Sequence, residues 1–133
     1  MTTVFISSPY SHPDADVLEA RTRAAGDLAA YLWRERGMLA FSPIAHWHEI
    51  GRRNHLPGHA KAWAAWNRQF VRMCDLVHVL CIDGWDASIG VAMEIEWAHD
   101  FNIPVIYVIP NDDGYRFSDD PPQRLLTGLR TLY

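Results

Sequence analysis

The sequence predicts an α/β fold in three layers, with a parallel sheet of four to five strands between helices. Short apolar runs alternate with longer segments of helical spacing along the chain, as in strand–helix–strand units. The central run, at 76–82, is short, hydrophobic and rich in β-branched residues, which is typical of a strand buried on both faces. The length of 133 residues suits one core. We therefore expect a single flavodoxin-like or Rossmann-like domain over residues 1–133.

Local signals place the individual elements. Apolar runs that end at proline, glycine or polar residues indicate strands, and apolar stripes at spacings of three and four residues indicate helices. In chain order we expect a strand at 3–7, a helix from Asp14 or Asp16 to Gly37, a strand at 38–41, a helix at 60–73, a strand at 76–82, a helix from Ser88, a strand at 105–109, a turn at 111–114 and a helix at 121–132.

Residues 44–58 form the longest stretch that we expect to be irregular. Loops of this length in compact domains are commonly lids or binding loops. The stretch contains His46 and His48, and a second histidine pair, His55 and His59, follows. These pairs could bind a metal ion, but no cysteine or carboxylate cluster accompanies them. We therefore expect no metal site.

Composition limits the classes of partner. The net charge of −4 and a pI near 5.9 argue against binding of a nucleic acid polymer, whereas a nucleotide-sized ligand remains possible. Cys74 and Cys81 fit no disulfide framework, which favours a reducing cytoplasm. The chain contains no signal sequence and no apolar run long enough to cross a membrane. Six tryptophans could serve an interface or a pocket that stacks a base.

Ligands of parallel α/β sheets bind at the carboxyl ends of the strands. The loops that follow the predicted strands should therefore meet around one ligand. Small hydroxyl residues in the first loop could hold a phosphate or a ribose at a helix start, although G-x-G-x-x-G and P-loop patterns are absent. The loop residues that we expect at the ligand are Ser7, Ser8, Pro9, Tyr10, His46, Trp47, Asp83, Gly84 and Trp85.

Arg21 lies within the apolar stripe of the first predicted helix, near its start. Its side chain could reach toward the end of the first strand and contact the ligand. Alternatively, its stem could lie over the core with the charged end in solvent.

Glu94 is the principal candidate for chemistry. In a helix that begins near Ser88, Val91 and Ala98 share an apolar face with Ile95, and Glu94 lies angularly between them. Glu94 should point inward and Glu96 outward. The positive end of the helix dipole favours an ionised carboxylate there. Glu94 is thus either a nucleophile or ligand-binding carboxylate, or a structural group paired with an arginine or backbone donor.

A resemblance sharpens this interpretation. The segment Gly84-Trp85-x-x-Ser88-x-Gly90-Val91-x-x-Glu94, with Ala98 and the strand after Pro104, resembles the nucleoside 2-deoxyribosyltransferase superfamily, which includes 2'-deoxynucleoside 5'-monophosphate N-glycosidases. Residues 5–13 resemble a bacterial and phage branch of it. The resemblance implies that Glu94 attacks the anomeric carbon of a deoxynucleoside and forms a glycosyl-enzyme, which water or a second base resolves. It implies no cofactor.

Ser88 distinguishes the branches of that superfamily. The transferases have a carboxylate at this position that binds the 5'-hydroxyl, and the monophosphate hydrolases have a serine. A hydroxyl at a helix start would bind a phosphate that a carboxylate would repel. Ser88 could equally be a plain N-cap. The resemblance also places Ser118 in the phosphate site of a neighbouring subunit, which implies a homodimer or higher homo-oligomer with a shared active site.

Two positions depart from the family pattern. Asn67 stands where the family has an aspartate, so the proton for the leaving base needs another source. Asp83 or Asp86 could supply it if desolvation raises the pKa of its carboxyl. Phe5 stands where the family has a tyrosine that contacts the nucleophile. The residues that could substitute for that tyrosine are Tyr10, Tyr107 and His46, while Tyr133 could reach a neighbouring site or be surface tail.

We therefore expect cleavage of the N-glycosidic bond of a (deoxy)nucleoside 5'-monophosphate, with Glu94 as nucleophile and Asn67, His46 and Trp47 facing the base. One alternative is base exchange between nucleosides. Another is a nucleotide-binding sensor without turnover, which Asn67 and Phe5 make credible. A third is an assembly protein whose tryptophans form an interface.

Overall fold

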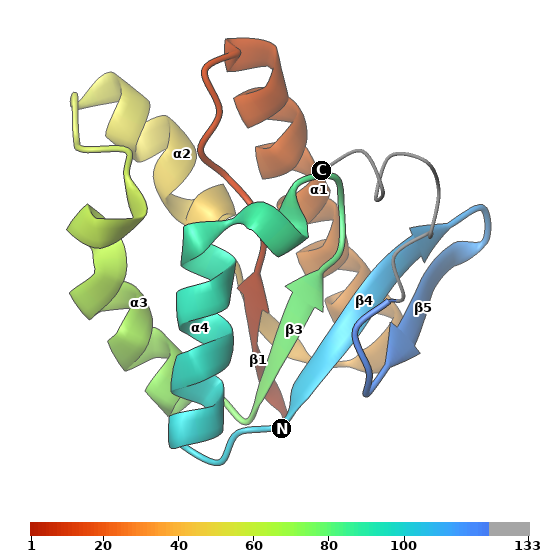
Figure 1. The fold of residues 1–133 in the computed structure, drawn as a ribbon. Helices are drawn as coiled ribbons and strands as arrows, with labels where there is room; N and C mark the ends of the chain where they lie inside the picture. The colour runs from red at the N-terminus through yellow and green to blue at the C-terminus, as the bar shows by residue number, and fades with distance from the viewer. Residues whose placement is uncertain (123–133) are drawn as a thin grey trace, which may run out of the picture.

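The computed structural model describes residues 1–122, which contain one five-stranded sheet with strand order β2-β1-β3-β4-β5. Four strands are parallel, and the last pairs antiparallel with its neighbour at the sheet edge (Figure 1). The strands are β1 (Thr3–Ser7), β2 (Leu39–Phe41), β3 (Leu76–Leu80), β4 (Val105–Asn111) and β5 (Gly114–Ser118). This order is the flavodoxin-like one, and the α/β fold class is confirmed.

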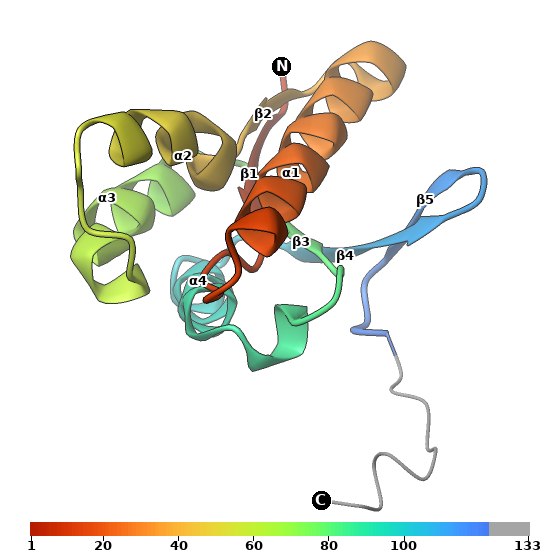
Figure 2. The ribbon, with the colours of Figure 1, turned by 90° about the horizontal axis from the view of Figure 1, so that it is seen from above.

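Helices cover both faces of the sheet, which gives three layers. Helix α1 (Ala15–Arg36) lies on one face, and α3 (Ala60–Met73) and α4 (Ile89–Asp100) lie on the other (Figure 2). Between β2 and α3 the chain forms α2 (Pro43–Arg53), and a 3₁₀ turn at Trp85–Ala87 precedes α4. Among the described residues no helix combines the length and the apolar character needed to span a bilayer.

Alternation along each strand divides the core in two. In β1, Val4 and Ile6 pack with Leu28 and Leu32 of α1, whereas Phe5 packs with the cluster under α3 and α4. Successive strand side chains point to opposite faces, so Ser7, which follows Ile6, faces α4. This phase places a hydroxyl group at the end of β1, directly under the helix that carries Glu94.

The boundaries of α1 follow its sequence signals. Asp14 is the N-cap and accepts a hydrogen bond from the Asp16 N–H at 2.9 Å. Gly37 ends the helix in the left-handed conformation, with φ of 62°, which glycine adopts without steric cost. Both ends agree with the sequence prediction.

Residues 44–58 correct the sequence prediction, because most of them are helical. The Ser42 Oγ accepts a hydrogen bond from the Ala45 N–H at 3.0 Å, and Pro43 occupies the first helical position. A serine N-cap followed by proline is a helix-start signal that the apparent end of strand β2 obscured. The irregular part of this stretch is confined to the few residues between α2 and α3.

The C-terminal part differs from the expectation in one respect. The turn predicted at 111–114 connects β4 to β5. The sequence analysis expected four to five strands, and β5 is the fifth. The helix predicted at 121–132 and the tail residue Tyr133 lie, from residue 123 onward, outside the described residues.

Candidate active site

The site lies where the chain direction across the sheet reverses. From β1 the chain crosses to β2 on one side, and from β3 it crosses to β4 on the other. The loops after β1 and β3 therefore diverge and leave a crevice, which is where open α/β sheets bind ligands. A cavity of about 550 Å³ occupies this position, with walls from α1, α2, α3 and the start of α4. Its size is that of a small-molecule site.

Glu94 lies in the wall of this cavity with only 5% of its surface exposed. The Ser7 Oγ donates a hydrogen bond to its Oε1 at 2.7 Å, and the Asn67 Nδ2 donates to its Oε2 at 3.3 Å. Both partners are neutral, so the structural alternative of an arginine partner does not apply to these two contacts. Glu96, on the same helix, is exposed. The inward direction predicted for Glu94 and the outward direction of Glu96 are confirmed.

The ionised state predicted for Glu94 is wrong at neutral pH. Burial raises the pKa of its carboxyl to about 8, and the hydrogen bonds from Ser7 and Asn67 offset only part of that rise. Glu94 lies in the second turn of α4, where the field of the helix end has weakened. Desolvation therefore outweighs the dipole, and the group is mostly protonated at neutral pH.

The N-terminus of α4 also opens into the cavity. The Ser88 Oγ accepts a hydrogen bond from the Val91 N–H at 3.2 Å, so Ser88 is the N-cap of the helix. That role leaves the hydroxyl hydrogen of Ser88 able to donate. The N–H groups of Ile89 and Gly90, which also line the cavity, have no partner within the helix. Such a helix start is suited to an anion.

Arg21 joins two loops of the cavity wall. Its Nη1 donates to the carbonyl oxygens of Tyr10 and Ser11 at 3.3 and 3.0 Å, and its Nη2 donates to that of Asp83 at 3.3 Å. Gly84 permits this approach, because a Cβ at that position would lie 2.5 Å from Nη2. The Arg21 side chain thus reaches toward the end of the first strand, which is the first of the two alternatives that the sequence analysis gave for it.

Tryptophan side chains form an apolar wall. The rings of Trp47 in α2 and Trp63 in α3 lie with centroids 5.0 Å apart and both line the cavity. Trp66 packs against Trp47 at 5.9 Å. The Trp63 Nε1 donates to the Pro57 carbonyl at 2.6 Å, which holds the α2–α3 loop against the ring. Flat aromatic surfaces at a cavity wall can stack a planar ligand.

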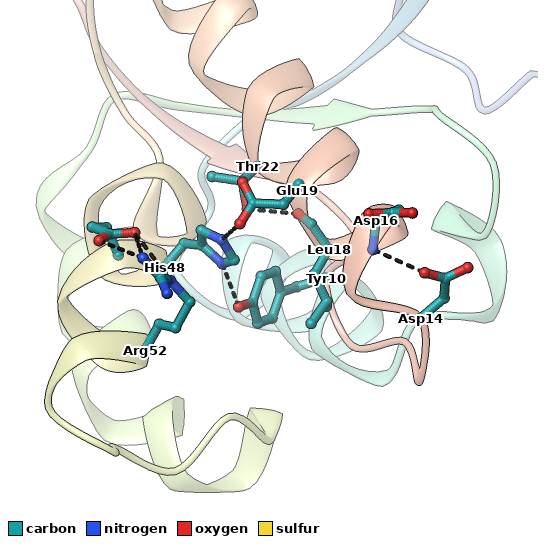
Figure 3. A network of polar contacts seen from close by, with 9 residues as sticks. Tyr10, Asp14, Asp16, Leu18, Glu19, Thr22, His48 and Arg52 are labelled. Atoms are coloured by element: carbon teal, nitrogen blue, oxygen red, sulfur yellow. Dashed lines mark hydrogen bonds and ion pairs between the residues drawn. The ribbon is translucent and has the colours of Figure 1, made fainter.

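A chain of polar contacts links Tyr10, His48 and Glu19 (Figure 3). The Tyr10 hydroxyl lies 2.6 Å from the His48 Nδ1, and the His48 Nε2 lies 2.8 Å from the Glu19 Oε1. The His48 side chain is 8% exposed, whereas that of Glu19 is half-exposed. The three residues come from the β1–α1 loop, α2 and α1. Tyr10 and His48 both line the cavity that contains Glu94.

Three buried polar atoms of cavity-lining residues have no hydrogen-bond partner among the described residues. They are the Ser8 Oγ, the Trp47 Nε1 and the Asn67 Oδ1. Buried polar atoms are normally satisfied, so all three are available to a ligand. Within residues 1–122, no group of three histidine, cysteine or acidic side chains is arranged to hold a metal ion.

The structure gathers most of the sequence-predicted residues at this cavity. Those that line it are Ser8, Tyr10, Arg21, Trp47, Asn67, Gly84, Ser88, Gly90 and Glu94. Ser7 does not line the cavity but donates its hydrogen bond to Glu94. Others do not line the cavity formed by the described residues, namely Pro9, His46, Asp83, Trp85, Asp86 and Ser118.

The physical reasons for these exceptions differ. Asp83 and Asp86 are exposed, so the desolvation that a proton donor would require is lacking there. The Trp85 ring packs against Tyr107, and His46 is an exposed residue whose ring packs against Phe41 and Trp47. Pro9 is buried. Ser118 lines a separate hollow beside β5.

Sequence reasoning missed several residues of the wall. Ile44, His48, Gly51 and Arg52 all line the cavity, and their spacing is that of one helix face. The signal was therefore present in the sequence. It was hidden because the segment was treated as a loop.

A family model described as a domain of unknown function, DUF1937, matches residues 2–109. The chain belongs to the DUF1937 family. The matched region extends from β1 into β4, so every residue that lines the cavity falls within the DUF1937 domain. No curated protein matches the chain.

Proposed function

We propose that this protein cleaves the N-glycosidic bond of a (deoxy)nucleoside 5'-monophosphate, with Glu94 as the nucleophile. The observation that carries the proposal is the position of the Glu94 carboxyl, which is buried between Ser7 and Asn67 in the wall of a nucleotide-sized cavity. The resemblance of the segment from Gly84 to Glu94 to the nucleoside 2-deoxyribosyltransferase superfamily supports the same assignment.

Two features of the cavity suit the two ends of a nucleotide. The start of α4, with the Ser88 hydroxyl and the N–H groups of Ile89 and Gly90, suits a phosphate group. The Trp47 and Trp63 rings suit a base. A nucleotide held between them would bring its sugar toward the Glu94 wall, and the arginine charge at Arg21 would add attraction for the phosphate.

The chemistry follows from the carboxyl group. Its ionised fraction attacks the anomeric carbon while the bond to the base breaks, and the ester that forms is hydrolysed by water. The hydrogen bonds from Ser7 and Asn67 hold both oxygens in place, which reduces the entropy lost on reaching the transition state. Because the Glu94 carboxylate is buried, its attraction for the positive charge that develops on the sugar is stronger than it would be in water.

The test is a screen of deoxynucleotides, ribonucleotides and nucleosides for release of free base, followed by mass spectrometry. The expected result is base release from a monophosphate, abolished in Glu94→Ala and retained in Glu96→Ala, the exposed glutamate on the same helix. Adding a second free base separates two reactions, because hydrolysis gives free sugar phosphate and base exchange gives a new nucleotide. Release that persists in Glu94→Ala would refute the nucleophile.

Two observations favour a second candidate, a nucleotide sensor without turnover. Asn67 cannot donate a proton of tunable pKa, and Glu94 is mostly protonated at neutral pH. A sensor would bind a nucleotide saturably in calorimetry and release no base. Glu94→Gln would then leave its affinity nearly unchanged.

We further propose a cytoplasmic homo-oligomer in which Ser118 reaches the phosphate site of a neighbouring copy. Ser118 ends β5, the edge strand of the sheet. Light scattering should give more than one copy per particle, and Ser118→Ala should weaken substrate affinity. A monodisperse monomer with full activity would refute this assembly.

A further inference from the structure

The leaving base needs a proton, and the cavity contains one well-placed group that the proposed reaction has not used. Purine and pyrimidine anions are poor leaving groups, so protonation of the base lowers the barrier. Asn67 is an amide, and Asp83 and Asp86 are exposed residues outside the cavity wall. The hydroxyl of Tyr10 remains.

Tyr10 differs from an isolated surface tyrosine because a second and a third group orient it. Its hydroxyl contacts the His48 Nδ1 at 2.6 Å, and Glu19 contacts the other ring nitrogen at 2.8 Å (Figure 3). The Tyr10 and His48 rings also meet edge to face, with centroids 5.6 Å apart. A nucleophile or acid oriented by a base that is itself oriented by a carboxylate is the arrangement used for proton transfer in many enzymes.

We propose that Tyr10, held by His48 and Glu19, donates the proton to the departing base. This role rests on the proposed function, and it assigns a catalytic residue that the resemblance does not supply. Tyr10 touches the substrate, whereas His48 and Glu19 act through Tyr10 as positioning residues and as the source of its replacement proton.

The step balances in atoms and charge. The proposed step starts from the form in which both ring nitrogens of His48 carry a hydrogen, with Nε2–H donating to Glu19 and Nδ1–H donating to the Tyr10 oxygen, which leaves the phenol hydrogen for the substrate. As the bond between Glu94 and the anomeric carbon forms, the bond to the base breaks and its electron pair goes to the base nitrogen. The Tyr10 proton goes to the base, and the Nδ1 proton of His48 goes to the Tyr10 oxygen.

The second half restores the starting state. Water attacks the anomeric carbon, and the ester bond to Glu94 breaks with its electrons returning to the carboxylate. The proton released by that water passes through the Tyr10 oxygen to the His48 Nδ1. The same groups thus act as acid in one step and as base in the next, as microscopic reversibility requires.

The surroundings of Tyr10 keep its hydroxyl protonated. Burial, and then the negative charge of Glu19, raise the pKa of the Tyr10 phenol above its ordinary value of 10. The hydroxyl therefore keeps its proton throughout the neutral range. Tyr10 also shares one cavity with Glu94, so both groups can reach a single nucleotide.

A purely structural contact between the first loop and α2 would have different consequences. Loss of such a contact would weaken binding or folding equally for all substrates. Loss of a proton donor slows the first step, in which the leaving group departs, only for substrates whose leaving group needs a proton. The leaving group is therefore the variable that separates the two roles.

The experiment compares a nucleotide with 4-nitrophenyl 2-deoxyribose 5-phosphate, whose nitrophenolate leaves without a proton. The hydroxyl is removed in Tyr10→Phe, and Tyr31→Phe is the matched control, because Tyr31 packs against Tyr115 and Phe117 away from the cavity. Thermal melting shows whether each variant is folded.

We expect Tyr10→Phe to lower kcat/KM for the nucleotide by about 100- to 10,000-fold and kcat/KM for the nitrophenyl substrate by less than about threefold. The ratio kcat/KM is compared because it reports the steps up to loss of the leaving group, whereas kcat also includes hydrolysis of the ester, in which Tyr10 carries a proton for both substrates. Glu19→Gln should show the same selectivity with a smaller loss. Equal losses on both substrates, or no loss on the nucleotide, would overturn the role of Tyr10 while leaving the proposed function intact. If the wild-type protein cleaves neither substrate, the proposed function fails and the role of Tyr10 fails with it.

Discussion

Replacing Glu94 by glutamine should make the protein more stable, and increasingly so as the pH rises. Glutamine has the same shape and cannot ionise. Its Nε2 can donate to the Ser7 Oγ while its Oε1 accepts from the Asn67 Nδ2, so both hydrogen bonds of the wild-type side chain have a counterpart. The main change is the loss of a titratable group from a buried position.

The magnitude follows from the pKa of that group. Burial raises the pKa of the Glu94 carboxyl from 4.5 to about 8, so between these values the folded state binds a proton that the unfolded state has lost. The folding free energy therefore becomes less favourable as the pH rises from about 4.5 and levels off above about 8. At 1.36 kcal/mol per pKa unit, the whole effect is about 5 kcal/mol.

The assay is urea unfolding of wild-type protein and Glu94→Gln near pH 5, 7 and 9. The stability difference between them should grow in favour of the variant by several kcal/mol, up to about 5, across that range. Glu96→Gln is the control, because this exposed side chain on the same helix should give a difference that changes by less than about 0.5 kcal/mol. A difference for Glu94→Gln that does not vary with pH, or that shrinks as the pH rises, would refute the reasoning.

Three further outcomes follow from the same structure. If ionised Glu94 is the nucleophile, kcat/KM for the nitrophenyl substrate, whose leaving group needs no proton, should rise about tenfold per pH unit up to about pH 8 and then level off. A fall over this range would instead indicate a general acid. Burial, with Arg36 nearby, lowers the pKa of His78 to about 4, so the unfolding free energy of the wild-type protein should fall as the pH drops from about 6.5 to 4. In urea titrations His78→Leu should remove about 3 kcal/mol of that loss. If the variant loses as much stability as the wild type over this pH range, the prediction is contradicted. Gly84 has a φ of 90° and lies against the Arg21 guanidinium, so Gly84→Ala should lower the unfolding free energy by about 1 to 3 kcal/mol and weaken nucleotide affinity in calorimetry. Wild-type values of both quantities would show that Arg21 moves freely.

The sequence predicted the position of Glu94 better than its protonation state. Helical phase depends on local spacing, and counting from Ser88 placed the carboxyl inward. The pKa depends on what surrounds the group, and those neighbours come from distant parts of the chain, Ser7 on β1 and Asn67 on α3. Only the assembled fold shows that desolvation exceeds the effect of the helix end.

The polar chain through His48 was missed although residues 43–53 contain the spacing of one helix face. Ser42 and Pro43 were taken as the end of the preceding strand, so the segment was read as a loop. Once α2 exists, His48 and Trp47 gain fixed directions toward Tyr10 and Trp63. The sequence showed which residue types were present in this segment, and the helix determined which of them share a wall.

The most direct test of the central role of Glu94 is intact-mass spectrometry of protein quenched during turnover of a nucleotide whose 2'-fluorine slows hydrolysis of the ester. We expect the mass to increase by one sugar phosphate, with the added group mapped to the peptide that contains Glu94 and absent in Glu94→Gln. Release of base with no added mass at any time, together with full activity of Glu94→Gln, would contradict the account.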